Sequence, residues 1–119
     1  GYNYDGTTTE NKLAKAMAST TGWNTSTGTG EIGNDQSLNN SSGFNAVPEG
    51  LCYSDGSFNS EGGNAVFWTS SENEDDTSYA LCNNLIVEND PNGSFTNGGF
   101  QMGSTFEKHF GLSVRFVRD

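Results

Sequence analysis

A chain of 119 residues with 15 acidic and five basic side chains has a net charge of −10, which opposes binding to nucleic acid phosphates and anionic membrane surfaces. We therefore expect no nucleic acid partner. Since no apolar run is long enough to span a bilayer, we also expect no direct membrane insertion of this domain. The length predicts a single domain over residues 1–119.

The composition lies close to that of disordered chains, because only 31% of the residues are apolar and Leu, Ile, Val and Phe together make up roughly a fifth. Aromatic residues argue for a folded chain. They include eight Phe and two Trp, and they fall in short clusters bounded by turn residues. We expect a thin aromatic core wrapped in ordered loops. The many Asn, Gly, Ser and Thr residues and the few lysines are typical of an extracellular or cell-surface location.

The first predicted element is a helix over residues 7–19, "TTTENKLAKAMAS". Thr7 followed by Glu10 has the spacing of a capping box. Lys12 and Lys15 are expected to face solvent, and a single apolar stripe faces the rest of the domain. The stripe consists of Leu13, Ala16 and Met17.

A long polar stretch follows the helix. Trp23 is expected to close the end of the helix packing, and residues 24–43 are predicted to form a loop pinned down by Ile32 and Leu38. Both a solvated insertion and a functional loop fit this stretch, and the insertion is the more ordinary interpretation.

The rest of the chain is predicted to consist of strands and turns. Asp55-Gly56 and "DPNG" (90–93) indicate tight turns. The segment 64–71 is apolar on both faces, which predicts a central strand, and 94–102 is expected to return antiparallel to 78–89. The predicted strands are 44–48, 64–71, 78–89, 94–102 and the closing segment 111–119. One helix followed by hairpin-linked strands predicts an α+β fold with a mostly antiparallel, twisted sheet and long loops.

The closing segment "GLSVRFVRD" alternates apolar and polar residues as a strand does. Leu112, Val114 and Phe116 share one face, and Arg115 lies opposite. We expect this strand inside the sheet, with Arg115 and Arg118 reaching carboxylates around its rim.

Four stretches in the right order resemble one bacterial family: "GFNAVPEGLCYSDGSF", "FWTSSE", "ALCNNL" and the closing "GLSVRFVRD". The family is the Fibrobacter succinogenes major paralogous domain, and the match runs from about Lys15 to Asp119. The resemblance implies a C-type lectin-like fold whose N- and C-terminal strands lie side by side. Family members usually carry a further segment and helix upstream. We therefore expect this chain to be an N-terminally shortened, C-terminal module of a larger secreted or surface protein.

The candidate metal ligands do not form a recognisable site. The acidic run from Glu72 to Asp76 is contiguous, unlike a calcium loop, and is expected to be a solvated turn. Cys52, Cys82 and His109 are too few ligands for zinc. The two cysteines either form a disulfide or are two small buried apolar side chains. We expect no cofactor and no metal.

The resemblance places a ligand-binding face on the long loops and on the strands after "FWTSSE". We expect a non-catalytic recognition module for an unknown protein or glycan ligand, because His109 lacks a nucleophile or carboxylate partner at diagnostic spacing. A structural or adhesin-tip module without a small-ligand site is the alternative. The candidate binding residues are Asn73, Glu74, Tyr79, Leu81, Asn83, Asn84, Phe95, Asn97, Phe100, Gln101, Phe106, Lys108 and Phe110.

Overall fold

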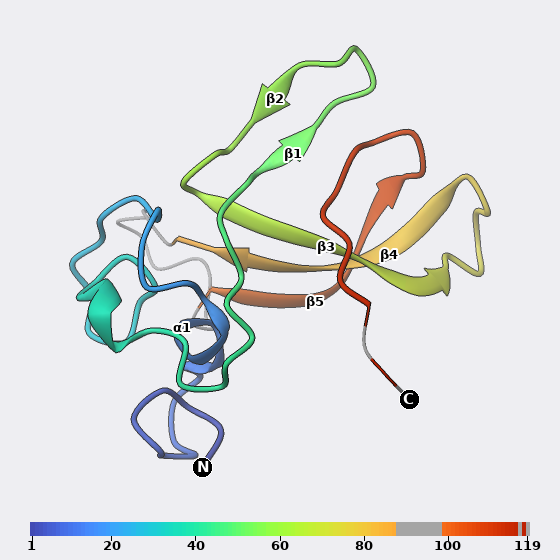
Figure 1. Ribbon diagram of the computed structural model, residues 1–119. Helices are drawn as coiled ribbons and strands as arrows, with labels where there is room; N and C mark the ends of the chain where they lie inside the picture. Colours follow the sequence, from blue (N-terminus) through green and yellow to red (C-terminus); the bar gives the residue numbers. More distant parts are fainter. Residues whose placement is uncertain (88–98, 117, 119) are drawn as a thin grey trace.

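A three-stranded antiparallel sheet runs through the middle of the molecule, in the order β3 (Asn64–Glu72), β4 (Tyr79–Ile86), β5 (Phe100–Glu107) (Figure 1). The computed structural model describes residues 1–87, 99–116 and 118. The helical elements are α1 (Leu13–Met17) and the 3₁₀ helix η1 (Gln36–Leu38). The other strands are β1 (Leu51–Cys52) and β2 (Phe58–Asn59). The predicted combination of antiparallel sheet and a single α-helix is therefore present among the described residues.

The strands of this sheet follow the alternation of the sequence. The predicted segments 64–71 and 78–89 correspond to β3 and β4, which pair from Asn64 with Ile86 to Trp68 with Cys82. The return strand β5 is antiparallel to β4, as expected, but it extends to Glu107, beyond the predicted end at residue 102. The predicted turn at 90–93 and the first part of the predicted return strand lie outside the described residues.

The prediction that 64–71 forms a central strand is wrong, because β4 is the central strand and β3 lies at the edge of the three-stranded order. The first part of β3 is nevertheless buried on both faces, through Ala65 on one and Val66 on the other, which explains its apolar sequence. Its outer backbone groups find single partners in two other segments. Gly50 N donates to Asn64 O at 2.9 Å, and Trp68 N donates to Ser113 O at 3.1 Å.

Two small apolar cores lie on opposite faces of the sheet, because successive side chains of a strand point to opposite sides. The α1-side core contains Ala65 and Leu85 from the sheet, together with buried residues of the N-terminal half. These are Ala14, Ala18, Trp23, Ile32 and Ala46. The hairpin-side core contains Leu51, Val66 and Cys82, with Trp68, Phe106, Phe110 and Leu112 packed around it.

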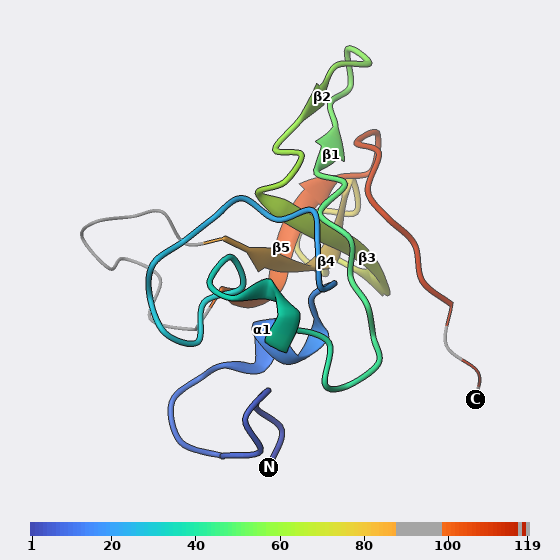
Figure 2. The same ribbon diagram turned by 60° about the vertical axis from the view of Figure 1, so that its left-hand side comes forward.

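The predicted Asp55-Gly56 turn is confirmed, and it joins β1 to β2 in a hairpin that projects from the sheet (Figures 1 and 2). Tyr53 N donates to Ser57 O at 2.8 Å, and Gly56 has the positive φ that this turn requires. The predicted strand 44–48 is wrong. This segment makes a single bridge, from Ala46 to Ala18, instead of a ladder.

The predicted helix over 7–19 is reduced to α1, and the capping box does not form. Glu10 has a φ of 57°, a left-handed conformation that takes it out of any helix. The physical reason is Asn3, whose buried amide nitrogen donates to the carbonyls of Thr9 and Glu10 at 2.9 Å each. The Asn3 side-chain oxygen also accepts from Lys12 N at 3.0 Å. The Thr7 hydroxyl donates to Asp5 at 2.6 Å and caps nothing.

Lys15, predicted to face solvent, is only 1% exposed. Its ammonium nitrogen donates to the carbonyls of Glu31 and Asp35 at 3.2 and 3.1 Å, to the carbonyl of Asn34, and to the side-chain oxygen of Asn39 at 2.8 Å. Burial lowers the pKa of Lys15, and the charge of Asp35 acts in the opposite direction. Lys15 thereby ties α1 to the long polar loop.

The predicted loop over 24–43 is confirmed except for the short helix η1. Trp23 is buried as expected, and its indole nitrogen donates to the Ser19 hydroxyl at 3.1 Å. Ile32 pins the loop to the α1-side core, whereas Leu38 is exposed. Lys15, instead of the predicted Leu38, holds the loop in place.

The closing segment is not a strand inside the sheet. It runs along the outer edge of β3 and makes two isolated bridges, Gly111 with Cys52 and Ser113 with Phe67 (Figure 1). Leu112 is partly buried, but Phe116 is 93% exposed, so the predicted shared face is not packed. The segment also does not pair with an N-terminal strand, since none is found in residues 1–12.

The arginines of this closing segment were expected to reach carboxylates. Among the described residues neither guanidinium forms an ion pair. Arg115 instead donates to the carbonyl of Phe44 and lies over its ring, with 4.4 Å between guanidinium carbon and ring centroid.

Replacing Lys15 by methionine keeps the length of the side chain but leaves one buried and three partly buried oxygens without this donor. We expect Lys15→Met to lower the free energy of unfolding by about 3 kcal/mol, measured by urea denaturation. Lys108→Met is the control, because it removes only an exposed ion pair with Glu72 and should change stability far less. Equal losses in the two variants would contradict the role of Lys15.

Candidate functional site

One half of the α1-facing side of the sheet is not covered by the N-terminal half of the chain. The α1-side core ends near Phe67 on β3, and beyond it the same face continues along β4 and β5. Cross-strand pairs place Asn83 beside Met102 and Leu81 beside Thr105. We call this surface the open face; its residues are Tyr79, Leu81, Asn83, Met102 and Thr105.

Local structure gives the open face its shape. Gly103 has a φ of 70° and is the extra residue in the register shift between the pairs Cys82–Ser104 and Asn83–Met102. Gly103 N donates to the side-chain oxygen of Asn83 at 3.4 Å, which holds the carboxamide at the bulge. Met102 is 76% exposed, so the face presents an apolar side chain next to an amide.

The structure divides the candidate binding residues between the two sides of the sheet. Tyr79, Leu81 and Asn83 come together on the open face. Residues of the opposite face or the cores cannot join them: Asn84, Gln101, Phe106, Phe110 and, beneath the α1-side core, Phe100. Phe95 and Asn97 lie outside the described residues.

Asn73 and Glu74 lie in the turn between β3 and β4, where the Asn73 side-chain oxygen accepts from Asp75 N at 2.8 Å. This contact makes Asn73 part of the turn itself.

A group of polar side chains marks the end of the sheet next to the open face. The Tyr79 hydroxyl donates to Glu107 at 3.1 Å, and His109 lies 2.6 Å from the other oxygen of the same carboxylate. The hydrogen bond and the negative charge of Glu107 raise the pKa of Tyr79. Lys108, which follows β5, pairs with Glu72 at the end of β3. Contrary to the expectation from the sequence, His109 therefore has a carboxylate partner, at an exposed position.

A groove runs from the open face along the closing segment. It consists of two hollows, of about 530 and 510 Å³, which share Phe44, Arg115 and Phe116. The first hollow also reaches Asn83 of the open face, and the second reaches Leu13 and Met17 of α1. We call the two hollows together the tail groove. None of its three shared residues was among the candidates chosen from the sequence.

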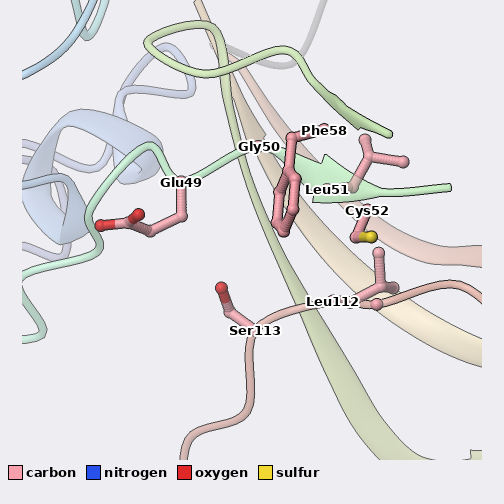
Figure 3. A pocket seen from close by; sticks show the side chains of 8 residues that line it. Glu49, Gly50, Leu51, Cys52, Phe58, Leu112 and Ser113 are labelled. Carbon is pink, nitrogen blue, oxygen red and sulfur yellow. The ribbon is translucent and has the colours of Figure 1, made fainter. Parts of the chain in front are cut away.

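A third hollow, of about 350 Å³, lies between the β1–β2 hairpin and the closing segment (Figure 3). Its walls are apolar, with Leu51 and Phe58 on the hairpin and Leu112 opposite, and the Cys52 sulfur lies among them. The Glu49 side chain extends away from that sulfur. His109 does not line this hollow, so no thiol–imidazole pair forms there.

Both cysteines are free thiols in the structure. Cys82 is fully buried in the hairpin-side core, and burial raises its pKa. Cys52 is partly exposed at the third hollow.

Within residues 1–87, 99–116 and 118, no group of three or more metal-ligating side chains comes together. No helix in this part of the chain has the length and apolar character needed to cross a membrane.

The tyrosine at the end of the open face gives a direct test of this geometry. We expect Glu107→Gln to lower the pKa of Tyr79, because the variant removes the charge that opposes phenolate formation. The measurement is the alkaline rise in phenolate absorbance, with Tyr79→Phe identifying the contribution of this one tyrosine. An unchanged titration of Tyr79 would contradict the contact.

The two thiols should differ in reactivity. We expect iodoacetamide to modify Cys52 in the folded protein and Cys82 only after unfolding, because Cys82 is inaccessible and its pKa is raised. Mass spectrometry of peptides cut after glutamate separates the two cysteines, because Glu61 and Glu72 lie between them, and Cys52→Ser should lose the early adduct. If neither cysteine reacts with iodoacetamide until a reductant is added, the two cysteines instead form a disulfide.

Comparison with known proteins gives one positive result. The model of the Fibrobacter succinogenes major domain family matches residues 2–118, nearly the whole chain. Searches of the curated proteins and of the solved structures give no match. The sequence motifs indicated a resemblance only from about Lys15 onward, whereas the family model matches from residue 2. The chain therefore belongs to the Fibrobacter succinogenes major domain family.

Proposed function

We propose that this domain is a non-catalytic recognition module of a bacterial cell-surface or secreted protein. In this proposal the fold is a variant of the C-type lectin-like fold, and the ligand is bound on the open face and in the tail groove. The low lysine content and high Asn, Gly, Ser and Thr content support an extracellular location.

The observation that carries the proposal is the continuity of the open face with the tail groove through Asn83. Together they present aromatic and aliphatic side chains next to amide and hydroxyl groups on a rigid sheet. Such mixed surfaces are typical of interface centres. Recognition without chemistry is also supported by the position of His109, whose imidazole is exposed and does not line the hollow that holds Cys52.

A structural role in a surface assembly is the second candidate. It is supported by β5, which pairs only with β4 in the described sheet and so presents an outer edge to a neighbouring chain. The two candidates differ in what they require of the open face. A recognition module needs Met102 and its neighbours, whereas an assembly module needs the β5 backbone.

The test is a screen of the immobilised domain against glycan arrays and secreted-protein panels, with calcium and with a chelator. We expect a ligand whose binding does not depend on calcium and which Met102→Glu weakens by at least about tenfold, since a charge on an interface centre costs about 1.4 kcal/mol or more. Phe58→Glu is the matched control, because Phe58 is 80% exposed on the hairpin, away from the open face. Equal binding by both variants would argue against the open face.

A further inference from the structure

The tail groove has a cation at its centre, and that cation is held in a fixed orientation. Arg115 lines both hollows. One of its terminal nitrogens donates to the carbonyl of Phe44, and its guanidinium lies 4.4 Å from the centroid of the Phe44 ring. A guanidinium has five N–H donors in a planar fork, so most of them are not used by this carbonyl. The stacked ring and the single backbone acceptor orient the fork in advance of any ligand.

The charge balance of the described residues leaves this cation without a carboxylate. Lys12 pairs with Asp5 and Glu10, and Lys108 pairs with Glu72. Lys15 is enclosed by four oxygens in the interior. Among the described residues Lys15, Arg115 and Arg118 have no carboxylate partner, and of these three only the two arginines are exposed. In a domain with a net charge of −10, the exposed basic side chains without a described carboxylate partner therefore lie on the closing segment.

Apolar groups surround Arg115. Val114 and Phe116 flank it in the sequence and are 59% and 93% exposed. The second hollow brings in Leu13, Met17 and the Phe44 ring. An exposed apolar cluster around one oriented arginine has the composition of an interface hot spot.

The polar groups of the second hollow favour a peptide over a sugar. Its one side-chain hydroxyl, that of Ser42, donates to Ala16 O at 2.7 Å and accepts from Phe44 N at 3.2 Å. A pyranose ring seated there would leave several of its own hydroxyls without partners, which costs free energy in each case. An aliphatic or aromatic side chain has no such requirement. The Arg115 fork, in contrast, matches a carboxylate through two parallel hydrogen bonds.

We propose that Arg115 anchors a carboxylate of a partner polypeptide, and that an apolar side chain next to that carboxylate fills the second hollow. This inference rests on the proposed function, because it names the ligand class of the same surface. The net charge of −10 disfavours a second copy of this chain as the partner. Screening over about 8 Å at physiological ionic strength lets the local charge at Arg115 outweigh the distant acidic groups.

The experiment uses a displayed library of random peptides and, in parallel, an array of neutral and acidic glycans. We expect the selected peptides to share an Asp, Glu or free C-terminal carboxylate next to an apolar residue. A synthetic peptide of the consensus sequence should lose at least about tenfold in affinity when its acidic residue is replaced by the amide, which corresponds to about 1.4 kcal/mol. Fluorescence polarisation with the labelled peptide measures this.

Three variants of the domain complete the test. Arg115→Gln removes the charge, and Arg115→Lys keeps the charge but loses the planar fork, so both should weaken the consensus peptide by at least about tenfold. Arg118→Gln is the matched control, because Arg118 is also exposed on the closing segment, and it should have little effect. Circular dichroism melting curves should be alike for the three variants, since neither arginine is buried.

The outcomes separate this inference from the proposed function. A ligand that depends on Met102 but binds equally to Arg115→Gln overturns the carboxylate anchor and leaves the recognition module standing. Selection of acidic glycans without acidic peptides, or of peptides that bind equally with the amide, also overturns the anchor. A ligand affected by neither Met102→Glu nor Arg115→Gln overturns both proposals.

Discussion

The buried ammonium group of Lys15 is the interaction on which the N-terminal half of this domain depends. With 31% apolar residues, the chain cannot hold its long polar loop by apolar burial alone. Lys15 instead donates to oxygens of Glu31, Asn34, Asp35 and Asn39, and so joins α1 to the loop by hydrogen bonds. The fixed loop brings Ile32 and Trp23 onto the sheet, where they complete the α1-side core. The hydrogen bonds of Lys15 thereby hold the loop where its apolar side chains can complete the α1-side core.

Small cores leave part of the sheet bare, and this produces the candidate site. The α1-side core covers one end of one face, and the hairpin-side core lies on the opposite face. Beyond the α1-side core, on the same face, β4 and β5 present the open face without cover from the N-terminal half. The closing segment then adds a second wall, because Ser113 bonds to the edge of β3 at Val66 and Trp68. A larger α1-side core would have buried Leu81 and Asn83, and with them this surface.

Alternation and turn chemistry predicted the central parts of the fold. The period-two pattern located β3 and β4, and Asp55-Gly56 located the hairpin. The same alternation placed Tyr79, Leu81 and Asn83 on one face. It failed for Leu112, Val114 and Phe116, because a side-chain pattern does not reveal whether a backbone has a partner strand. The α-helix was overestimated because Asn3 competes for the backbone of residues 9–12. Met102 and Arg115 were not predicted as site residues. The bulge at Gly103 determines the position of Met102, and a contact with Phe44, 71 positions earlier in the chain, determines that of Arg115.

Lys15 and Arg115 show how two similar contacts acquire different roles through their surroundings. Each cation donates to a backbone carbonyl and lies near an aromatic ring, Tyr4 for Lys15 and Phe44 for Arg115. Lys15 is enclosed, and four protein oxygens surround its charge, so it can only stabilise the fold. Arg115 is exposed, and one carbonyl and one ring fix its plane while leaving further N–H groups to other acceptors. Since an acidic surface elsewhere repels anions, the proposed carboxylate site falls on this oriented guanidinium with apolar neighbours. In that proposal, the charge that disfavours anionic ligands over the rest of the domain makes the closing segment the selective position.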